Sequence, residues 1–320
     1  MESGLVELAD GIRRVTFALP LGIDHVHCYL LRDGDGTWTI VDTGLGLPGA
    51  GQAWQAVLDE LDAPVGRIVI SHFHPDHVGA AAIVAELTGA PVHQGAIDHA
   101  QCVRAWGRER SLDRLTAFMV EHGLPIADAD AFRADSETLA SYVQVVDEPE
   151  LLEPGERIDG WEILHLPGHA DGHLALLRDG VLIAGDTLLA TISPVVGLYN
   201  DARPDPLGDF LSSLARIVEL APRIAYTGHR AAIEDPAGRA RELVAHHAHR
   251  LELTAEALDG EPVTAFEISH AIFPDPLSSG LRRFALAEAL AHVEHLVGKG
   301  AAERVDAAPV RYAAAKAPPA

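Results

Sequence analysis

The sequence is poor in cysteine and in basic residues. Two cysteines, Cys28 and Cys102, are too few for a disulfide scaffold or a cysteine-rich zinc module, so we interpret both as buried thiols. The 24 Lys and Arg are outnumbered by 47 Asp and Glu, which gives a formal net charge of −23. Because such a negative field repels phosphodiester backbones, the composition argues against nucleic acid as a partner.

The sequence also lacks long apolar runs and the pattern of a secretory signal. Charge or glycine interrupts every apolar run before the about 18 residues that a membrane helix requires, so we expect no membrane partner. The N-terminus contains early acids and no basic segment followed by an apolar core, which predicts a cytoplasmic protein. A length of 320 residues with 48% hydrophobic residues predicts a globular chain of one large or two smaller domains.

Histidines are concentrated in one short stretch. Residues 71–77 read Ser-His-Phe-His-Pro-Asp-His and follow the apolar segment 68–70. If this segment ends a buried strand, His72 and His74 leave the extended chain on the same side and can bind one cation. A lone histidine would be interpreted as part of the core, but four ligand-type side chains at a strand-to-helix junction predict a metal site.

The second half of this stretch predicts a further ligand position. Pro75 is well tolerated at a helix start, so we expect a helix that begins there and continues to residue 87. Asp76 and His77 lie in its first turn, where adjacent residues diverge by about 100°. The two side chains can therefore reach a second position close to the first one.

Three later apolar segments each deliver one polar side chain at their carboxyl end. These side chains are His169 after residues 161–166, Asp186 after residues 181–185 and His229 after residues 223–227. Earlier in the chain, residues 12–19, 25–31 and 37–42 predict a β-meander that ends at Asp42. Two interpretations of Asp42 stand: a turn or helix cap, or a carboxylate that orients a ligand histidine.

The remaining segments are expected to be mostly helical. Residues 96–141 predict an amphipathic helical insertion, interpreted as a substrate cover or as a packing or dimer surface. A strand is expected at 141–146 and a helix at 206–220. Towards the C-terminus we expect helices at 239–258, 264–270 and 280–297, then a small hairpin and a disordered tail at 313–320.

Five short motifs occur in the order found in one family. They are V-D-T-G with Asp42, H-x-H-x-D-H at 72–77, P-G-H with His169, G-D-T with Asp186 and G-H with His229. Together they resemble the motifs of the metallo-β-lactamase superfamily. The resemblance implies the α+β class with an αβ/βα four-layer sandwich, and it implies that Asp42 orients the site.

The same resemblance implies a dinuclear metal site. One ion would be bound by His72, His74 and His169, the other by Asp76, His77 and His229, and Asp186 would bridge both. Nitrogen and carboxylate donors without thiolate suit two Zn²⁺ ions and also tolerate Mn²⁺ or Fe. Two such ions can lower the pKa of a shared water to about 7, so Asp186 as the bridge and Asp76 as a proton carrier would be the catalytic carboxylates.

The C-terminal part is similar to the winged-helix-like extension of the lactamase-B2-like branch of this superfamily. We therefore expect a catalytic domain at 1–238 and a winged-helix-like domain at 239–312. Two features depart from the family's pattern. The last motif reads Tyr-Thr-Gly-His-Arg at 226–230, where many relatives have Pro-Gly-His-Gly, and the 96–141 insertion matches no motif. The resemblance therefore does not supply the substrate.

Several other polar side chains have two interpretations each. His173 is expected either to support the site or a developing oxyanion, or to pack as an ordinary histidine. Tyr199 would donate a hydrogen bond to an oxyanion, or pack as an ordinary tyrosine. His246, His247 and His249 lie on one expected helix without a carboxylate at ligand spacing, which indicates a solvated or interdomain face.

The ligand set favours hydrolysis of a small-molecule ester, thioester or lactone, by a chain that can form a homodimer. A first alternative is a nuclease or phosphodiesterase of the same superfamily, against which the acidic C-terminal region argues. A second is a mononuclear iron persulfide dioxygenase that would use only His72, His169 and Asp186. Retention of the other ligand residues makes that alternative less economical.

Overall fold

The computed structural model describes residues 4–9, 11–20, 22–108, 110–273, 276–305 and 307–315. The chain divides into two compact units. The first, here called the motif unit, comprises Met1–Arg110, Leu139–Pro194 and Leu220–Arg239; the second, the C-terminal unit, comprises Ser111–Thr138, Val195–Glu219 and Ala240–Ala320. Two segments of the expected catalytic domain, 111–138 and 195–219, thus belong with the C-terminal residues.

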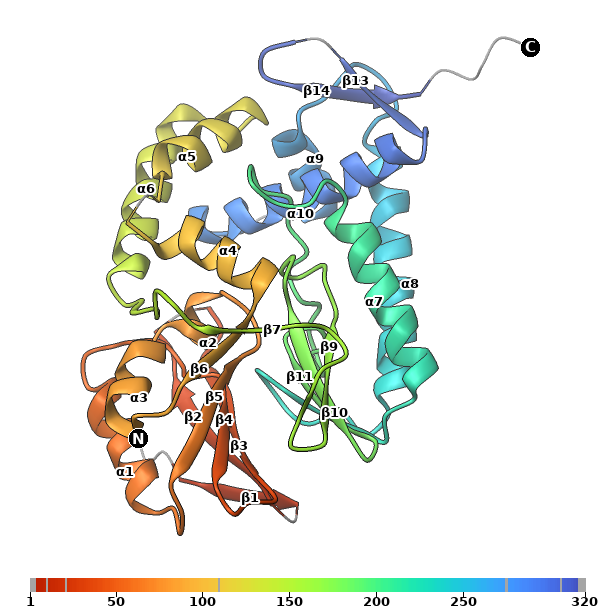
Figure 1. The fold of residues 1–320 in the computed structure, drawn as a ribbon. Coiled ribbons are helices and arrows are strands. Elements are labelled where there is room, and N and C mark those ends of the chain that lie inside the picture. The colour runs from red at the N-terminus through yellow and green to blue at the C-terminus, as the bar shows by residue number, and fades with distance from the viewer. Residues whose placement is uncertain are drawn as a thin grey trace. The chain divides into compact units, whose positions relative to one another are not determined.

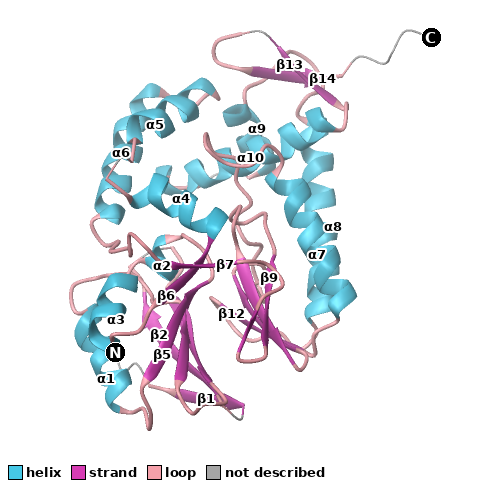
Figure 2. Cartoon of the chain, viewed as in Figure 1, coloured by secondary structure: helices cyan, strands magenta, loops and turns pink. Residues whose placement is uncertain are grey.

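The motif unit contains most of the strands. In chain order its elements are β1 (Val6–Ala9), β2 (Ile12–Ala18), β3 (His25–Arg32), β4 (Trp38–Val41), α1 (Ala50–Asp59), β5 (Val65–Ile70), α2 (Pro75–Val78), α3 (Ala81–Thr88), β6 (Val92–Gly95), α4 (Ala96–Trp106), β7 (Glu150–Leu152), β8 (Arg157–Ile158), β9 (Trp161–His165), β10 (Leu174–Arg178), β11 (Val181–Gly185) and β12 (Ile224–Thr227). Figures 1 and 2 show these strands as two sheets.

The first sheet has the order β1-β2-β3-β4-β5-β6-β7 and the second the order β12-β11-β10-β9-β8. Strands β4 to β7 run parallel to one another, and so do β11 and β12, so several strands end at the same edge of their sheet. This arrangement places the residues that follow β4, β5, β11 and β12 where polar side chains from both sheets can meet.

Apolar side chains fill the space between the two sheets and cover the other face of the first. Val41 and Val69 of the first sheet pack with Ile163, Leu176 and Ile183 of the second, all nearly inaccessible to solvent. A second cluster joins the opposite face of the first sheet to α1, α2 and α3. The two facing sheets agree with the expected αβ/βα sandwich.

Two details of the motif unit differ from expectation. Residues 141–146 form no strand; their backbone instead bonds to two glycine turns, through Gly46 N–H to Tyr142 O and Gln144 N–H to Gly79 O. The β-branched and aromatic composition of this stretch was therefore overridden by tertiary pairing. The helix expected to continue from Pro75 is interrupted between α2 and α3, where a Cβ on Gly79 would overlap the Pro75 carbonyl oxygen.

The C-terminal unit is mainly helical. Its elements are α5 (Leu112–Glu121), α6 (Ile126–Ala140), α7 (Pro206–Leu220), α8 (Pro236–Glu256), α9 (Ala265–Ile272), α10 (Ser279–Gly298), β13 (Ala302–Val305) and β14 (Arg311–Ala314), with α6, α7 and α8 extending a few residues past the unit's bounds. The expected order of three helices and a hairpin is observed. The hairpin is longer than predicted, because residues 313 and 314 of the expected tail pair in β14. The rest of that tail, apart from Ala315, lies outside the described residues.

The core of this unit draws on all three of its segments. Met119 of α5, Phe132 of α6 and Leu198 pack with Ile268 of α9 and Leu290 of α10. These contacts explain why the 111–138 and 195–219 segments belong to this unit rather than to the motif unit. Among the helices of the described residues, none has the length and apolar character that crossing a membrane would require.

Candidate metal centre

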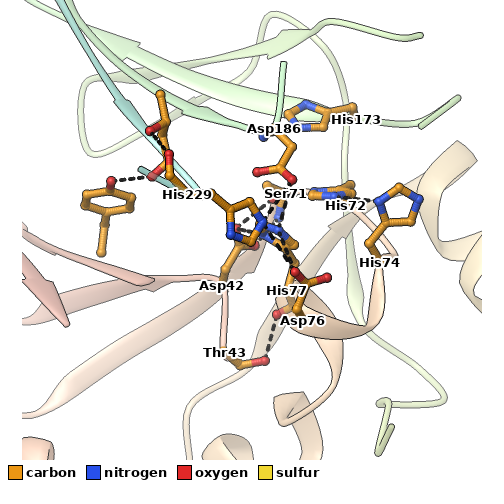
Figure 3. Close-up of polar contacts among 12 residues, drawn as sticks. Asp42, Thr43, Ser71, His72, His74, Asp76, His77, His173, Asp186 and His229 are labelled. Atoms are coloured by element: carbon orange, nitrogen blue, oxygen red, sulfur yellow. Dashed lines mark hydrogen bonds and ion pairs between the residues drawn. The ribbon is translucent and has the colours of Figure 1, made fainter. Parts of the chain in front are cut away.

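Polar residues from both sheets meet at one edge of the motif unit (Figure 3). Asp42 follows β4, His72 follows β5, Asp186 follows β11 and His229 follows β12. Two backbone hydrogen bonds join the sheets here, from Leu174 N–H to Ser71 O (2.8 Å) and from His27 N–H to Gly228 O (2.7 Å). The ends of the strands are thereby fixed relative to one another.

The seven residues expected to bind metal are brought together. Ligand atoms lie within 4.8 Å of one another in three sets: His72, His74 and His169; His72, His77 and Asp186; and Asp76, His77 and His229. Asp186 Oδ2 lies 3.2 Å from His229 Nε2, 3.6 Å from His77 Nε2 and 3.7 Å from His169 Nε2. The Asp186 carboxylate is therefore within reach of residues from both expected ligand groups.

Hydrogen bonds orient three of the imidazoles with Nε2 towards the centre. His77 Nδ1 donates to Asp42 Oδ2 (2.8 Å), and His229 Nδ1 donates to the carbonyl oxygen of His25 (2.6 Å). His72 Nδ1 lies 2.9 Å from Ser71 Oγ, whose own proton is donated to Asp42, so here too Nδ1 is the donor. A neutral imidazole that donates through Nδ1 keeps a lone pair on Nε2, which is the arrangement of metal-binding histidines.

Asp42 fixes two neighbouring elements. Its Oδ1 accepts the backbone N–H of Ser71 (2.7 Å), and its Oδ2 accepts Ser71 Oγ (2.7 Å) as well as His77 Nδ1. The residue has φ 63°, in the left-handed region that is costly for residues other than glycine. The interpretation of Asp42 as a carboxylate that orients a histidine agrees with these contacts.

The donor set suits a divalent ion. His77 Nε2 and Asp186 Oδ1 are buried without a hydrogen-bond partner among the described residues. His72 Nε2 lies 3.1 Å from His74 Nδ1, close to the about 3.3–3.4 Å that separates two nitrogens on one tetrahedral zinc ion. Buried polar atoms without protein partners are costly, and an ion with nitrogen and oxygen ligands would satisfy them.

The pKa values of the ionisable residues in this site are strongly shifted by burial and by neighbouring ionisable side chains. Burial lowers the pKa of His74 to about 3 and that of His72 well below its usual value. Burial alone would raise the pKa of Asp76, but His77 and His229 in their protonated forms hold it at about 2. The same two histidines outweigh burial at Asp186 and keep its pKa well below the usual range. Both carboxylates are therefore anionic at neutral pH.

His173 is part of the support of this site. It is fully buried, its Nε2 accepts the backbone N–H of Asp186 (3.1 Å), and its Nδ1 donates to Thr187 Oγ1 (3.1 Å). Its ring stacks on that of His72, with 4.8 Å between centroids. Both ring nitrogens are thus engaged with protein, which agrees with the supporting interpretation. Tyr199 belongs to the C-terminal unit, where it is half-buried and burial raises its pKa to about 12.

Two supporting residues on α4 were not predicted. Asp98 Oδ1 accepts the backbone N–H of Phe73 (2.9 Å), and Trp106 Nε1 donates to the Phe73 carbonyl oxygen (2.7 Å). Phe73 lies between His72 and His74, so α4 fixes the peptide groups on both sides of it. Asp98 is fully buried, and Gln94 donates to its other oxygen (2.6 Å). No local motif marks these residues, because their contacts depend on how α4 packs.

The G-H motif is followed by Arg230 instead of glycine, and this difference affects the backbone conformation. Arg230, which stands where many relatives have glycine, has φ 68°. Two early histidines hold this loop: Arg230 N–H donates to His25 Nε2 (3.0 Å), and His27 Nε2 donates to the Arg230 carbonyl oxygen (2.8 Å). These bonds maintain a left-handed turn without glycine, so His229 keeps its place in the site.

Comparisons with known proteins agree with this geometry. A family model described as the metallo-beta-lactamase superfamily matches residues 21–229, and one described as the metallo-beta-lactamase-like C-terminal domain matches residues 251–315. Among solved structures, the chain is similar to a metallo-beta-lactamase family protein from Thermus thermophilus, with 37% identity and a TM-score of 0.84. That match covers 96% of this chain and 100% of the other.

Two bacterial relatives have names that denote hydrolases. A probable metallo-hydrolase of Bacillus subtilis, YqjP, is 28% identical over 275 residues, which are 80% of this chain and 82% of that protein. The hydroxyacylglutathione hydrolase GloC of Haemophilus influenzae is 29% identical over 180 residues, covering 53% of this chain and 70% of that protein.

Proposed function

Because the chain belongs to the metallo-β-lactamase superfamily and is a metal-dependent hydrolase, we propose that it hydrolyses a small ester, thioester or lactone at a site with two divalent ions. The observation that supports this most is the position of Asp186, whose Oδ2 lies 3.2 to 3.7 Å from histidines of both ligand groups. A carboxylate in that place is suited to bridge two ions.

The residues divide into two ligand groups. His72, His74 and His169 would hold one ion, while Asp76, His77 and His229 would hold the other, with Asp186 shared. When bound, Zn²⁺ ions in such a site supply a lowered pKa for water and polarisation of a substrate carbonyl oxygen. The second group is the feature that favours hydrolysis over an iron dioxygenase, which would use only His72, His169 and Asp186.

Asp76 is the proposed proton carrier. Its carboxylate is anionic at neutral pH, since its pKa is held at about 2, and its Oδ2 lies 3.3 Å from His229 Nε2. Its side chain is 13% exposed and therefore accessible to water. Asp76 would accept a proton from the attacking water and pass it to the leaving group.

The substrate class rests on chemistry and charge. The relative named hydroxyacylglutathione hydrolase suggests an acyl compound as substrate, and an acylglutathione is a thioester. The net charge of −23 disfavours the alternative of a nuclease or phosphodiesterase, because a nucleic-acid backbone would be repelled.

The test combines metal content with a substrate panel. Protein purified without added metal is analysed for elements and assayed with a thioester, a lactone, a β-lactam and a phosphodiester. About two Zn or Mn per chain with thioester or lactone turnover is expected. One iron per chain with none of these activities would favour the dioxygenase, and turnover of the phosphodiester alone would favour the nuclease.

A further inference from the structure

A second group of histidines lies in the C-terminal unit, on α8. His246 and His247 were expected to form a solvated or interdomain face without a carboxylate at ligand spacing. The structure corrects this: His247 is fully buried, and Glu288 of α10 places a carboxylate oxygen within 4.8 Å of a ring nitrogen of each histidine. The sets of potential ligands in the motif unit meet the same limit of distance. Sequence spacing could not reveal Glu288, because it depends on the pairing of two helices.

The hydrogen bonds around His247 determine which of its ring nitrogens carries the proton and which carries the lone pair. His292 Nδ1 lies 2.7 Å from the carbonyl oxygen of Glu288 and must donate to it. His292 is fully buried, and burial favours the neutral imidazole, so its Nε2 is an acceptor. His247 Nδ1 lies 3.2 Å from this Nε2 and therefore carries the proton. The lone pair of His247 is then on Nε2, as in metal-binding histidines whose other nitrogen donates to protein.

The carboxylate of Glu288 is buried in the same place. Glu288 is 6% exposed. Glutamate is rarely buried to this extent unless it is paired with another group or bound to a metal. Burial raises the pKa of Glu288 to about 8, and Arg250, whose guanidinium lies over the ring of Phe273 at 4.2 Å, acts against this shift. A divalent ion between Glu288 and the two histidines would supply a closer positive charge.

We propose that His246, His247 and Glu288 form a binding site for a divalent transition-metal ion in the C-terminal unit. Two imidazoles and one carboxylate suit Zn²⁺, with a water molecule as the fourth ligand. His246 is half-buried and gives the ion a path from solvent, whereas His247 and Glu288 are buried. An ion held by residues from α8 and α10 would stabilise the pairing of these helices.

The test compares zinc content among three variants of the full chain. Each protein is stripped with a chelator, reloaded with Zn²⁺ at neutral pH, freed of excess zinc by gel filtration and analysed for zinc per chain. His246→Gln and Glu288→Gln are each expected to bind one zinc fewer than the unsubstituted protein. His249→Gln is the matched control: its side chain is 67% exposed on the same helix and lies outside the group, so its zinc content should be unchanged.

The comparison does not depend on how many ions the motif unit binds, because that number is common to all variants. Equal zinc content in the unsubstituted protein and in His246→Gln and Glu288→Gln would overturn the proposal and leave a hydrogen-bonded histidine pair. If Glu288→Gln fails to fold, His246→Gln decides, since its side chain is half-buried. A thermal midpoint raised by Zn²⁺ less in His246→Gln than in His249→Gln would be the second supporting result.

Discussion

Asp186 contacts the site through both its carboxylate and its backbone. Its Oδ2 lies near histidines of both ligand groups, its Oδ1 is buried, and its backbone N–H is bound by His173. A change at this position therefore alters the charge of the site while the neighbouring strand β11 remains paired.

We predict that Asp186→Asn lowers hydrolysis by at least about 100-fold and lowers the metal content, because the amide keeps the shape but loses the negative charge. The measurements are turnover of the substrate found in the panel and metal per chain. Asp135→Asn, at an exposed position of α6, is the control and should leave both unchanged. Full turnover by Asp186→Asn would contradict the dinuclear mechanism.

Trp106 allows a test of the support given by α4. Trp106→Phe keeps most of the apolar surface but removes the 2.7 Å hydrogen bond to the Phe73 carbonyl oxygen. We expect metal affinity to fall by about 10- to 100-fold, as for other groups that orient metal ligands. Trp161→Phe is a matched control, because Trp161 is buried in the same unit and its Nε1 has no hydrogen-bond partner among the described residues. Equal metal affinities of the two variants would show that the bond is not needed.

Asp98 should contribute a pH dependence to stability. Burial raises its pKa from 3.8 to about 7, so between these values the folded chain binds more protons than the unfolded chain. The stability that this group contributes is fully present below the unfolded pKa and is lost as pH rises through about 7. We predict that the loss of unfolding free energy from pH 5 to pH 8 is smaller in Asp98→Asn, measured by urea denaturation. If the unfolding free energies of Asp98→Asn and of the unsubstituted protein changed in parallel with pH, the raised pKa of Asp98 would be refuted.

At the scale of elements, the turn after β12 leaves the space that two side chains of the site occupy. A Cβ on Gly228 would overlap Asp186 Oδ1 and lie 2.7 Å from His77 Cε1. Only glycine leaves room there for both side chains. The G-H motif therefore has two functions: His229 is a ligand candidate, and Gly228 makes space for the others.

We predict that Gly228→Ala lowers metal content and hydrolysis, because the added methyl group displaces the Asp186 carboxylate. Metal per chain and turnover are compared with those of Gly298→Ala, in which the new methyl group meets no atom within 4 Å. The control should keep both values. Normal metal content in Gly228→Ala would mean that the loop moves to accommodate the methyl group at little cost.

Elements differ in how far they were predictable from sequence. The strands that precede His72, Asp186 and His229 have strong apolar patterns, and the ligand-type residues follow them directly, so the grouping of these residues at the ends of the strands could be predicted. Residues 141–146 have strand-like composition but pair with glycine turns, which no local pattern indicates. The contacts of Asp98 and Trp106 with Phe73, and of Glu288 with His247, join distant segments and required the packed structure.

At the scale of the whole molecule, the C-terminal unit is not a contiguous domain. Its core combines side chains from three segments, including Met119, Phe132 and Leu198 with Ile268 and Leu290. The sequence predicted the order of its last five elements but not the contribution of the earlier segments. Amphipathic helices show which face is apolar, yet they do not identify the element that covers it.

We predict that a chain ending at residue 239 exposes apolar surface, because α5 and α6 lose their contacts with α9 and α10. Binding of a hydrophobic dye and the fraction of protein that remains in solution after centrifugation are the measurements. A chain ending at residue 315 removes only residues outside the described part of the structure and serves as the control. Equal dye binding by the two chains would contradict the shared core.

The interleaved core of the C-terminal unit has a consequence for synthesis on the ribosome. Helices α5 and α6 emerge early, whereas α9 and α10, which cover their apolar side chains, emerge only near the end of translation. Folding of this unit therefore has to wait for the last helices, unlike a domain that folds as soon as its own segment is complete. A chain that stops early would keep the apolar faces of α5 and α6 uncovered, and chaperones and proteases could distinguish it from a finished one.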